Sequence, residues 1–292
     1  MRIIAMSDIR GHYQEFTRNL RIIRQRWWNA KEDIFIFCGD YIDGGPDSLK
    51  SLKVVKTLCE KGHAKAVLGD HEVMFLEWLF NDDSSFQRPW PLHLDDSATL
   101  RDLTSNGFIH AVKSETYGRD EEPQTSVFFR DRVRDELMTR HPEIIKWLLS
   151  IPLVLETESQ IFVHAGINES AGDKWQQETD PYAFVESEQV FRRPFSKDVI
   201  AGHIPTSSPL LSGDPAYQGV FWDGSNHYYL NGSVEKTGNI PMLIWDSSDG
   251  SYMSPVRSKQ GGWIGADREV FRDLVSGDLA KGLKAGWDRG EA

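Results

Sequence analysis

Short apolar runs that end in polar residues constrain the fold of this chain more than any other feature of its sequence. Three such runs, at residues 2–6, 34–38 and 64–68, are each followed by a segment with helical periodicity. Runs of this length, rich in β-branched and aromatic residues, indicate strands. Alternating strands and helices predict an α/β fold, in which the polar residues after the strands gather at one edge of a sheet.

The rest of the chain divides into a helical part and a strand-rich part. Residues 81–140 contain three prolines and helical stretches at 98–103 and 130–138, which we interpret as an inserted helical segment over the site. A further helix is expected at 143–150 because Pro142 suits its first turn. Short runs bounded by Gly, Pro, Asn or Asp then predict strands at 153–156, 160–163, 198–201, 218–222, 227–230 and 241–245.

Composition excludes several classes of protein. Of 292 residues, 39% are hydrophobic, which is typical of a globular chain rather than a disordered one. With 33 Lys and Arg against 44 Asp and Glu, the net charge of −11 makes nucleic acid and anionic membranes poor candidate partners. The sequence contains no apolar stretch of the roughly 18 residues that a membrane span needs and no secretory leader, so we expect a cytoplasmic protein.

Aspartate and histidine residues stand at the ends of five predicted strands. Taken singly, an Asp after a strand is usually a turn or capping residue, and a lone buried His is usually a hydrogen-bonded core residue. Taken together, they form a ligand set that suits Mn²⁺, Fe or Zn²⁺. Glycine precedes three of them, which would let the loops approach one another closely. The residues are Asp8, Asp40, Asp43, Asp70, His71, His164 and His203.

The same residues occur in five ordered motifs that resemble those of the calcineurin-like metallophosphoesterases. The likeness is strongest to the phosphoprotein phosphatase branch, and especially to its small bacterial and phage serine/threonine phosphatases. The motifs here are Asp8-Ile9-Arg10-Gly11, Gly39-Asp40-Tyr41-Ile42-Asp43-Gly44-Gly45, Gly69-Asp70-His71-Glu72, His164-Ala165-Gly166 and Gly202-His203-Ile204-Pro205. The resemblance implies an α/β/β/α sandwich of two mixed sheets flanked by helices. We expect this domain to span residues 1–255, with the insertion at 81–140, followed by a C-terminal tail at 256–292 that contains one helix.

The resemblance also implies a role for each site residue. Asp40 would bridge two metal ions, Asp8 would belong to the first metal seat, and the second seat would comprise Asp70, His164 and His203. His71 would protonate the leaving oxygen while Asp43 orients its ring, and Arg192 would bind the substrate phosphate. The cofactor would be a divalent metal, with Mn²⁺ favoured and Fe or Zn²⁺ as alternatives.

Three departures from the family motifs fall on functional positions. Arg10 replaces a ligand histidine, Asp70 replaces an asparagine, and Gly44 replaces an arginine that binds phosphate. A guanidinium stays protonated in proteins and cannot ligate a metal, so the number of ions is left open at one or two. Arg10 and Asp70 carry opposite charges and are expected to pair. We hypothesise that Arg10 partly replaces the first metal, either by neutralising the carboxylates or by contacting phosphate. One ion would then remain on Asp40, Asp70, His164 and His203, with His12 as an alternative stand-in ligand.

The predicted function is therefore metal-dependent hydrolysis of phosphate monoesters, with water activated by the metal. The substrate would be a phosphorylated protein or small molecule. Two alternatives stay open: a dinucleoside polyphosphate hydrolase, or an impaired pseudo-phosphatase that binds a phosphorylated partner without turning it over. The oligomeric state cannot be predicted from these motifs.

Overall fold

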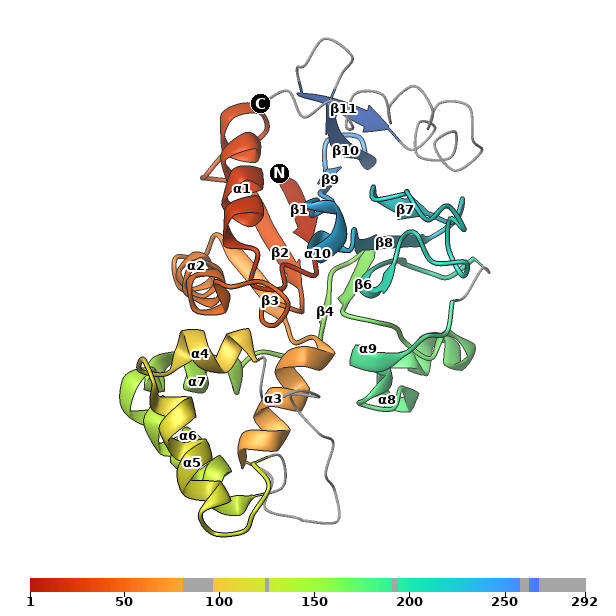
Figure 1. The fold of residues 1–292 in the computed structure, drawn as a ribbon. Helices are drawn as coiled ribbons and strands as arrows, with labels where there is room; N and C mark the ends of the chain where they lie inside the picture. The colour runs from red at the N-terminus through yellow and green to blue at the C-terminus, as the bar shows by residue number, and fades with distance from the viewer. Residues whose placement is uncertain (81–96, 124–125, 191–193, 258–262, 268–292) are drawn as a thin grey trace.

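The computed structural model describes residues 1–80, 97–123, 126–190, 194–257 and 263–267. Two mixed β-sheets lie face to face, with helices on their outer sides (Figure 1). The first sheet has six strands in the order β11-β10-β9-β1-β2-β3, and the second has five in the order β4-β5-β6-β8-β7. The α/β/β/α sandwich expected from the sequence is thus confirmed.

The first sheet is built on the repeated strand–helix units at the start of the chain. Strands β1 (Arg2–Met6), β2 (Ile34–Cys38) and β3 (Ala64–Val67) pair in parallel, because helices α1 (Tyr13–Arg26) and α2 (Ser48–Glu60) connect them. Three antiparallel strands extend the sheet beyond β1; they are β9 (Leu243–Asp246), β10 (Ser251–Arg257) and β11 (Trp263–Asp267).

The second sheet has a parallel centre and antiparallel edges. Its strands are β4 (Val154–Glu156), β5 (Gln160–Val163), β6 (Asp198–Pro205), β7 (Phe221–Trp222) and β8 (His227–Asn231). β5, β6 and β8 run in parallel, whereas β4 and β7 pair antiparallel at the two edges. The register shifts between Ala201 and Pro205 of β6, and this irregularity contains His203.

Three buried apolar layers hold the sandwich together. Ile3, Ile36 and Val67 of the first sheet meet side chains of the second sheet, so alternate residues of β1 and β2 face opposite layers. The outer face of the second sheet packs against α8 (Trp175–Glu178), which follows the short helix η2 (Glu169–Lys174), and against α9 (Ala183–Glu186). The outer face of the first sheet packs against α1 and α2.

The remaining helices form a group beside α2, at the lower left of Figure 1. Ser97 and Ser126 begin α4 and α6 by accepting hydrogen bonds from the amides of Leu100 and Phe129. The helices are α3 (Asp70–Phe80), α4 (Ala98–Leu103), α5 (Phe108–Tyr117), α6 (Val127–Arg140) and α7 (Pro142–Leu148). A short helix, α10 (Val234–Thr237), follows β8.

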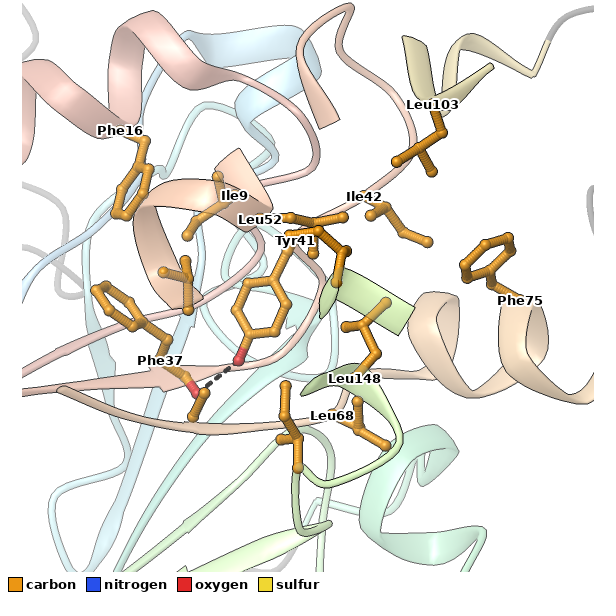
Figure 2. Close-up of a cluster of buried hydrophobic side chains, with 14 of the residues drawn as sticks. Ile9, Phe16, Phe37, Tyr41, Ile42, Leu52, Leu68, Phe75, Leu103 and Leu148 are labelled. Atoms are coloured by element: carbon orange, nitrogen blue, oxygen red, sulfur yellow. Dashed lines mark hydrogen bonds between the residues drawn. The ribbon is translucent and has the colours of Figure 1, made fainter. Parts of the chain in front are cut away.

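The core continues under the site loops. Figure 2 shows Tyr41 among buried aliphatic and aromatic side chains, with its hydroxyl directed at the backbone of β2. That hydroxyl donates to the Val67 carbonyl at 2.6 Å, or to that of Phe37 at 3.0 Å, so the loop after β2 is anchored to the ends of two strands. Phe75 of α3 and Leu103 of α4 complete this part of the core.

Two details differ from the sequence analysis. β10 crosses the boundary predicted at residue 255, and β11 pairs with β10, so the sheet extends into the expected tail. Helices α4, α5 and α6 lie within the expected insertion, and they pack against α2, α3 and α7. Residues 81–96 and the tail from residue 268 onward, where a helix is expected, lie outside the described residues.

Candidate metal centre and active site

The predicted metal ligands lie at the carboxyl ends of five strands. Asp8 follows β1, Asp40 follows β2, Asp70 begins the helix after β3, His164 follows β5, and His203 lies in the irregular part of β6. Both sheets contribute, so residues far apart in the sequence meet at one edge of the sandwich. We call Asp8, Asp40, Asp70, His164 and His203 the ligand cluster.

Glycines let the loops approach as closely as the sequence analysis predicted. A Cβ atom at Gly69 would lie 2.2 Å from Asp40 Oδ1, and one at Gly202 would lie 2.3 Å from Asp8 Oδ2. No side chain fits at such distances, so both positions require glycine.

The backbone of these loops is strained at the site. Seven described residues other than glycine have a positive φ, and five of them belong to the site. Such conformations cost of order 1 kcal/mol or more each and persist where the surrounding structure enforces them. The five are Asp8 (53°), Arg10 (49°), Asp40 (58°), Asp43 (67°) and His203 (56°).

A buried carboxylate enforces this loop geometry. Glu72 is fully buried and accepts hydrogen bonds from the amides of Asp40 (2.9 Å), Tyr41 (2.8 Å), Ile42 (3.1 Å) and Gly69 (3.0 Å). Burial and the nearby Asp40 carboxylate raise the pKa of Glu72 to about 7, although these amides lower it. Glu72 therefore fastens the loops after β2 and β3 to each other, a role that the sequence analysis missed.

The side chains of the ligand cluster converge on one point. Asp70 Oδ1 lies 2.9 Å from His164 Nε2 and 3.3 Å from His203 Nδ1, and Asp40 Oδ1 lies 3.4 Å from His164 Nε2. Within the described residues, three groups have ligand atoms close enough for one ion: Asp70 with His164 and His203, Asp8 with Asp40 and His164, and Asp40 with Asp70 and His71.

The ring of His164 is oriented for metal binding. Its Nδ1 lies 2.7 Å from the carbonyl oxygen of Cys38 and must donate to it, since a carbonyl only accepts. Nε2 is therefore the nitrogen that can ligate an ion. A backbone carbonyl on the other ring nitrogen is the usual partner of a metal-binding histidine.

Asp8 provides the test of whether the cluster suits a cation. Its side chain is buried, and Oδ2 accepts from the His203 amide at 3.2 Å, but Oδ1 has no hydrogen-bond partner. Burial raises the pKa of both Asp8 and Asp40, because it removes the carboxylates from water, and the neighbouring carboxylates of Asp70 and Asp8 raise the pKa of Asp40 further. A bound cation would satisfy the unpartnered oxygen and keep both groups ionised, so the residues present fit a divalent ion.

His71 lies beside the ligand cluster and is held by residues of two other elements. Its Nδ1 lies 2.7 Å from Asp43 Oδ2, and Nε2 lies 3.9 Å from Asp40 Oδ2. Thr99 of α4 donates to Asp43 Oδ1 at 2.6 Å and fixes that carboxylate. Burial lowers the pKa of His71, but Asp40 and the hydrogen bond to Asp43 outweigh it and raise the pKa to about 9.

Arg10 points its guanidinium into the same site. Nη1 lies 3.5 Å from Asp40 Oδ2, Nη2 lies 3.4 Å from Glu235 Oε1, and Nε donates to the Asp43 carbonyl at 3.4 Å. The expected pairing with Asp70 is wrong, because Asp70 is occupied by His164 and His203. Burial alone would lower the pKa of Arg10, but these carboxylates raise it, so the side chain is a permanent cation.

An open cleft of about 360 Å³ gives access to the site. Its lining includes five residues already described, namely Arg10, Asp40, Asp70, His71 and His203. The other described lining residues come from β6 and from the segment around α10; they are Pro205, Asn231, Ser233, Glu235 and Lys236. Helices α4–α6 contribute no residue to this described lining, and they reach the site through Thr99 instead.

Two further predictions concern residues at the margin of the site. Arg192, the expected phosphate ligand, lies outside the described residues. His12 faces Glu15, with 3.8 Å between Nδ1 and Oε2, and belongs to none of the three candidate ligand groups. His12 is therefore not a stand-in ligand in this geometry.

Comparison with known proteins agrees with this geometry. The model of the calcineurin-like phosphoesterase family matches residues 1–244. The chain belongs to this family. The family resemblance inferred from the five motifs is thereby confirmed. Metallophosphoesterases use divalent metals, and the ligand cluster offers candidate ligands for such an ion.

Curated relatives of this phosphoesterase include symmetrical bis(5'-nucleosyl)-tetraphosphatases. A symmetrical bis(5'-nucleosyl)-tetraphosphatase of Methylococcus capsulatus is 30% identical over 168 residues, which cover 57% of this chain and 44% of the relative. A protein of the same name from Xylella fastidiosa is 26% identical over 218 residues, or 73% of this chain and 58% of the relative. The chain thus spans about half the length of these relatives.

Solved structures of other phosphoesterases resemble this one at low sequence identity. A cold-active protein-tyrosine phosphatase of a Shewanella species has a TM-score of 0.49 at 13% identity, covering 90% of this chain and 80% of that one. A metallophosphoesterase from Sphaerobacter thermophilus has a TM-score of 0.43 at 13% identity, covering 98% of this chain and 97% of that one.

No helix among the described residues of this phosphoesterase is long and apolar enough to cross a membrane.

Proposed function

We propose that this protein is a metal-dependent phosphatase that hydrolyses phosphate esters. The observation that carries the proposal is the pairing of His71 with Asp43 directly beside the ligand cluster, at the wall of an open cleft. A histidine held by a carboxylate next to a cation site is what protonation of a leaving oxygen requires. A protein that only binds phosphate needs no such pair, which argues against the pseudo-phosphatase alternative.

The ligand cluster would hold the ion through Asp8, Asp40, Asp70, His164 and His203. A divalent ion bound there acts as a Lewis acid on phosphoryl oxygens and lowers the pKa of bound water. Arg10, already oriented toward Asp40, places a fixed positive charge where the phosphoryl oxygens of a substrate would lie.

His71 supplies the proton in the proposed reaction. Because Nδ1 is tied to Asp43, Nε2 is the atom that faces the cleft. As a water oxygen bonds to phosphorus, the bond to the leaving oxygen breaks and that oxygen takes the proton from Nε2. The attacking water loses a proton, and protonation of Nε2 from solvent completes the cycle. Asp43, fixed by Thr99, keeps the ring oriented throughout and favours its charged form before the proton is transferred.

A phosphate monoester, on a protein or a small molecule, is the substrate that we propose first, because one phosphoryl group needs only Arg10 and the ion for recognition. A dinucleoside polyphosphate is the second candidate, and the names of the curated relatives favour it. We propose Mn²⁺ as the ion, with Fe or Zn²⁺ as alternatives, since Asp and His ligands suit all three.

The test is hydrolysis of p-nitrophenyl phosphate, a phosphopeptide and a dinucleoside tetraphosphate by the purified protein, with Mn²⁺, Zn²⁺, Ni²⁺ or Mg²⁺ added. An Asp40→Asn variant, which removes a metal ligand, is prepared in parallel and controls for contaminating phosphatases. We expect metal-stimulated turnover that the variant loses. Turnover that does not exceed the variant's with any ion would refute the proposal, and preference for the dinucleotide over the phosphopeptide would decide between the two substrates.

A further inference from the structure

The three candidate ligand groups share members in a way that limits the number of ions. His164 belongs to two of them, and Asp40 and Asp70 together belong to the third. Nδ1 of His164 is committed to the Cys38 carbonyl, so only Nε2 is available, and one imidazole nitrogen binds one ion. The two groups that contain His164 therefore cannot each hold an ion through it, and the third group takes both of its carboxylates from the other two.

Arg10 occupies the other side of Asp40. The two oxygens of that carboxylate face different partners: Oδ1 lies 3.4 Å from His164, in the ligand cluster, and Oδ2 lies 3.5 Å from the Arg10 guanidinium. Asp40 thus joins the ion position to a permanent cation. A guanidinium there neutralises charge and can bind phosphoryl oxygens, but it contributes no lone pair to a second ion.

Glu235 of α10 forms a second ion pair with this guanidinium. Its Oε1 lies 3.4 Å from Arg10 Nη2, and the Arg10 side chain, 21% exposed, lies between Glu235 and Asp40. Gly44 makes room for this arrangement, because a Cβ atom at position 44 would lie 3.2 Å from Glu235 Cγ and 3.5 Å from Arg10 Cβ. Arg10, Gly44 and Glu235 are therefore sterically linked.

We propose that this centre binds a single divalent ion and that Arg10, positioned by Glu235, serves as its second cation. Arg10 would bind the phosphoryl group beside the ion, and Glu235 would be a positioning residue that touches neither the ion nor the substrate. The inference rests on the proposed phosphoesterase function, although its tests need no turnover.

The first test counts ions. The purified protein is stripped with chelator, reloaded with excess Mn²⁺, freed of unbound ion and analysed by mass spectrometry of the metal. We expect one ion per chain in the natural protein, and two in Arg10→His, where a second set of ligands forms with Asp8 and Asp40. Two ions in the natural protein, or one in a folded Arg10→His variant, would overturn the proposal. The count for the natural protein is decisive even if the variant does not fold.

The second test asks whether replacing Glu235 weakens or strengthens the binding of phosphate. Binding of inorganic phosphate to the Mn²⁺-loaded protein is measured by calorimetry for Glu235→Gln and for Glu158→Gln, an equal change of charge in the exposed turn before β5. If Glu235 positions Arg10, its loss weakens phosphate binding by about fivefold, the upper range for a partly exposed ion pair. If Glu235 acts only as a nearby negative charge, its removal tightens binding, and that outcome would refute the positioning role.

A double variant completes the test. With Arg10→Gln already in place, Glu235→Gln should cause no further loss of phosphate affinity, because there is no guanidinium left to orient. Additive losses would contradict the proposal. Neither measurement depends on catalysis: one ion and tight phosphate binding without hydrolysis would refute the proposed function and leave this inference standing.

Discussion

Two histidine–carboxylate clusters lie at opposite ends of the second sheet, and they differ in what they leave unsatisfied. At the amino end of β8, His227 donates from Nδ1 to Asp223 (2.5 Å) and from Nε2 to Glu169 (2.9 Å), with all three side chains buried. Both of its nitrogens are used, and its backbone is not strained. We call these three residues the His227 cluster.

The ligand cluster contains the same residue types in a different state. Asp8 Oδ1 lacks a partner, three of its five residues have a positive φ, and an open cleft reaches it. Contacts between histidine and carboxylate therefore do not by themselves mark a functional site. Unsatisfied buried atoms, enforced strain and solvent access distinguish the cluster built for a ligand from the one built for stability.

Asp40→Asn is the strongest test of this difference between the ligand cluster and the His227 cluster. Because Asp40 contributes to two of the candidate ligand groups, we expect loss of tight metal binding and a fall in turnover of at least about three orders of magnitude. In the presence of chelator the variant should be as stable as the natural protein or more so, since burial disfavours the charged carboxylate. Metal titration and thermal unfolding with chelator would check both parts. Lower stability of the metal-free variant would mean that Asp40 is structural, like Asp223.

His71→Asn tests whether His71, beside the ligand cluster, is the proton donor of the reaction. Loss of the proton donor should lower kcat by about 10²- to 10³-fold for an alkyl phosphate, whose leaving oxygen needs protonation. For p-nitrophenyl phosphate, whose leaving group p-nitrophenolate needs no proton, we expect a smaller fall in kcat. Steady-state kinetics with both substrates would show it. Equal losses with the two would contradict the role of His71 as the acid.

The His227 cluster should respond in the opposite manner. Asp223→Asn leaves a buried histidine with one charged partner instead of two, which we expect to lower the free energy of unfolding by about 3 kcal/mol. Metal content and kcat should not change. Urea denaturation together with metal analysis provides the measurement. Loss of the metal would mean that the two ends of the sheet are coupled.

The same cluster predicts a pH dependence of stability. Burial lowers the pKa of His227, but the hydrogen bonds to Asp223 and Glu169 outweigh it and raise the pKa to about 9, from 6.5 in the unfolded chain. A histidine whose pKa is raised on folding stabilises the folded protein fully below pH 6.5. This stabilisation is lost as the pH rises through 9. We expect a loss of about 3 kcal/mol over this range, measured as a difference between the natural protein and His227→Gln. Parallel pH profiles for the two proteins would refute this assignment.

Residues at strand ends were predictable from the sequence because local pattern and site coincide there. Asp8, Asp40 and His164 each lie within two residues of the end of an apolar run, and the structure brings them together as expected. Thr99 and Glu235 were missed, since both act across long separations and follow no strand. The Thr99 contact with Asp43, for example, spans 56 positions.

The strands at the end of the chain were missed for a related reason. Pro255 lies within β10, opposite Gly265 of β11, and a proline in a short run argues against a paired strand when only the sequence is read. The end of β6 was also missed, because the irregularity that contains His203 interrupts the alternation of buried residues.

The four amide contacts of Glu72 have a consequence for how ions exchange. They hold the loops after β2 and β3 in place through protein atoms alone, so the ligands keep their positions when an ion leaves. Loading a new ion then requires no refolding of the loops. Competition among ions at this centre should follow the intrinsic preference of carboxylate and imidazole ligands together with the supply of each metal. The identity of the bound metal is thus a property of the surroundings as much as of the chain.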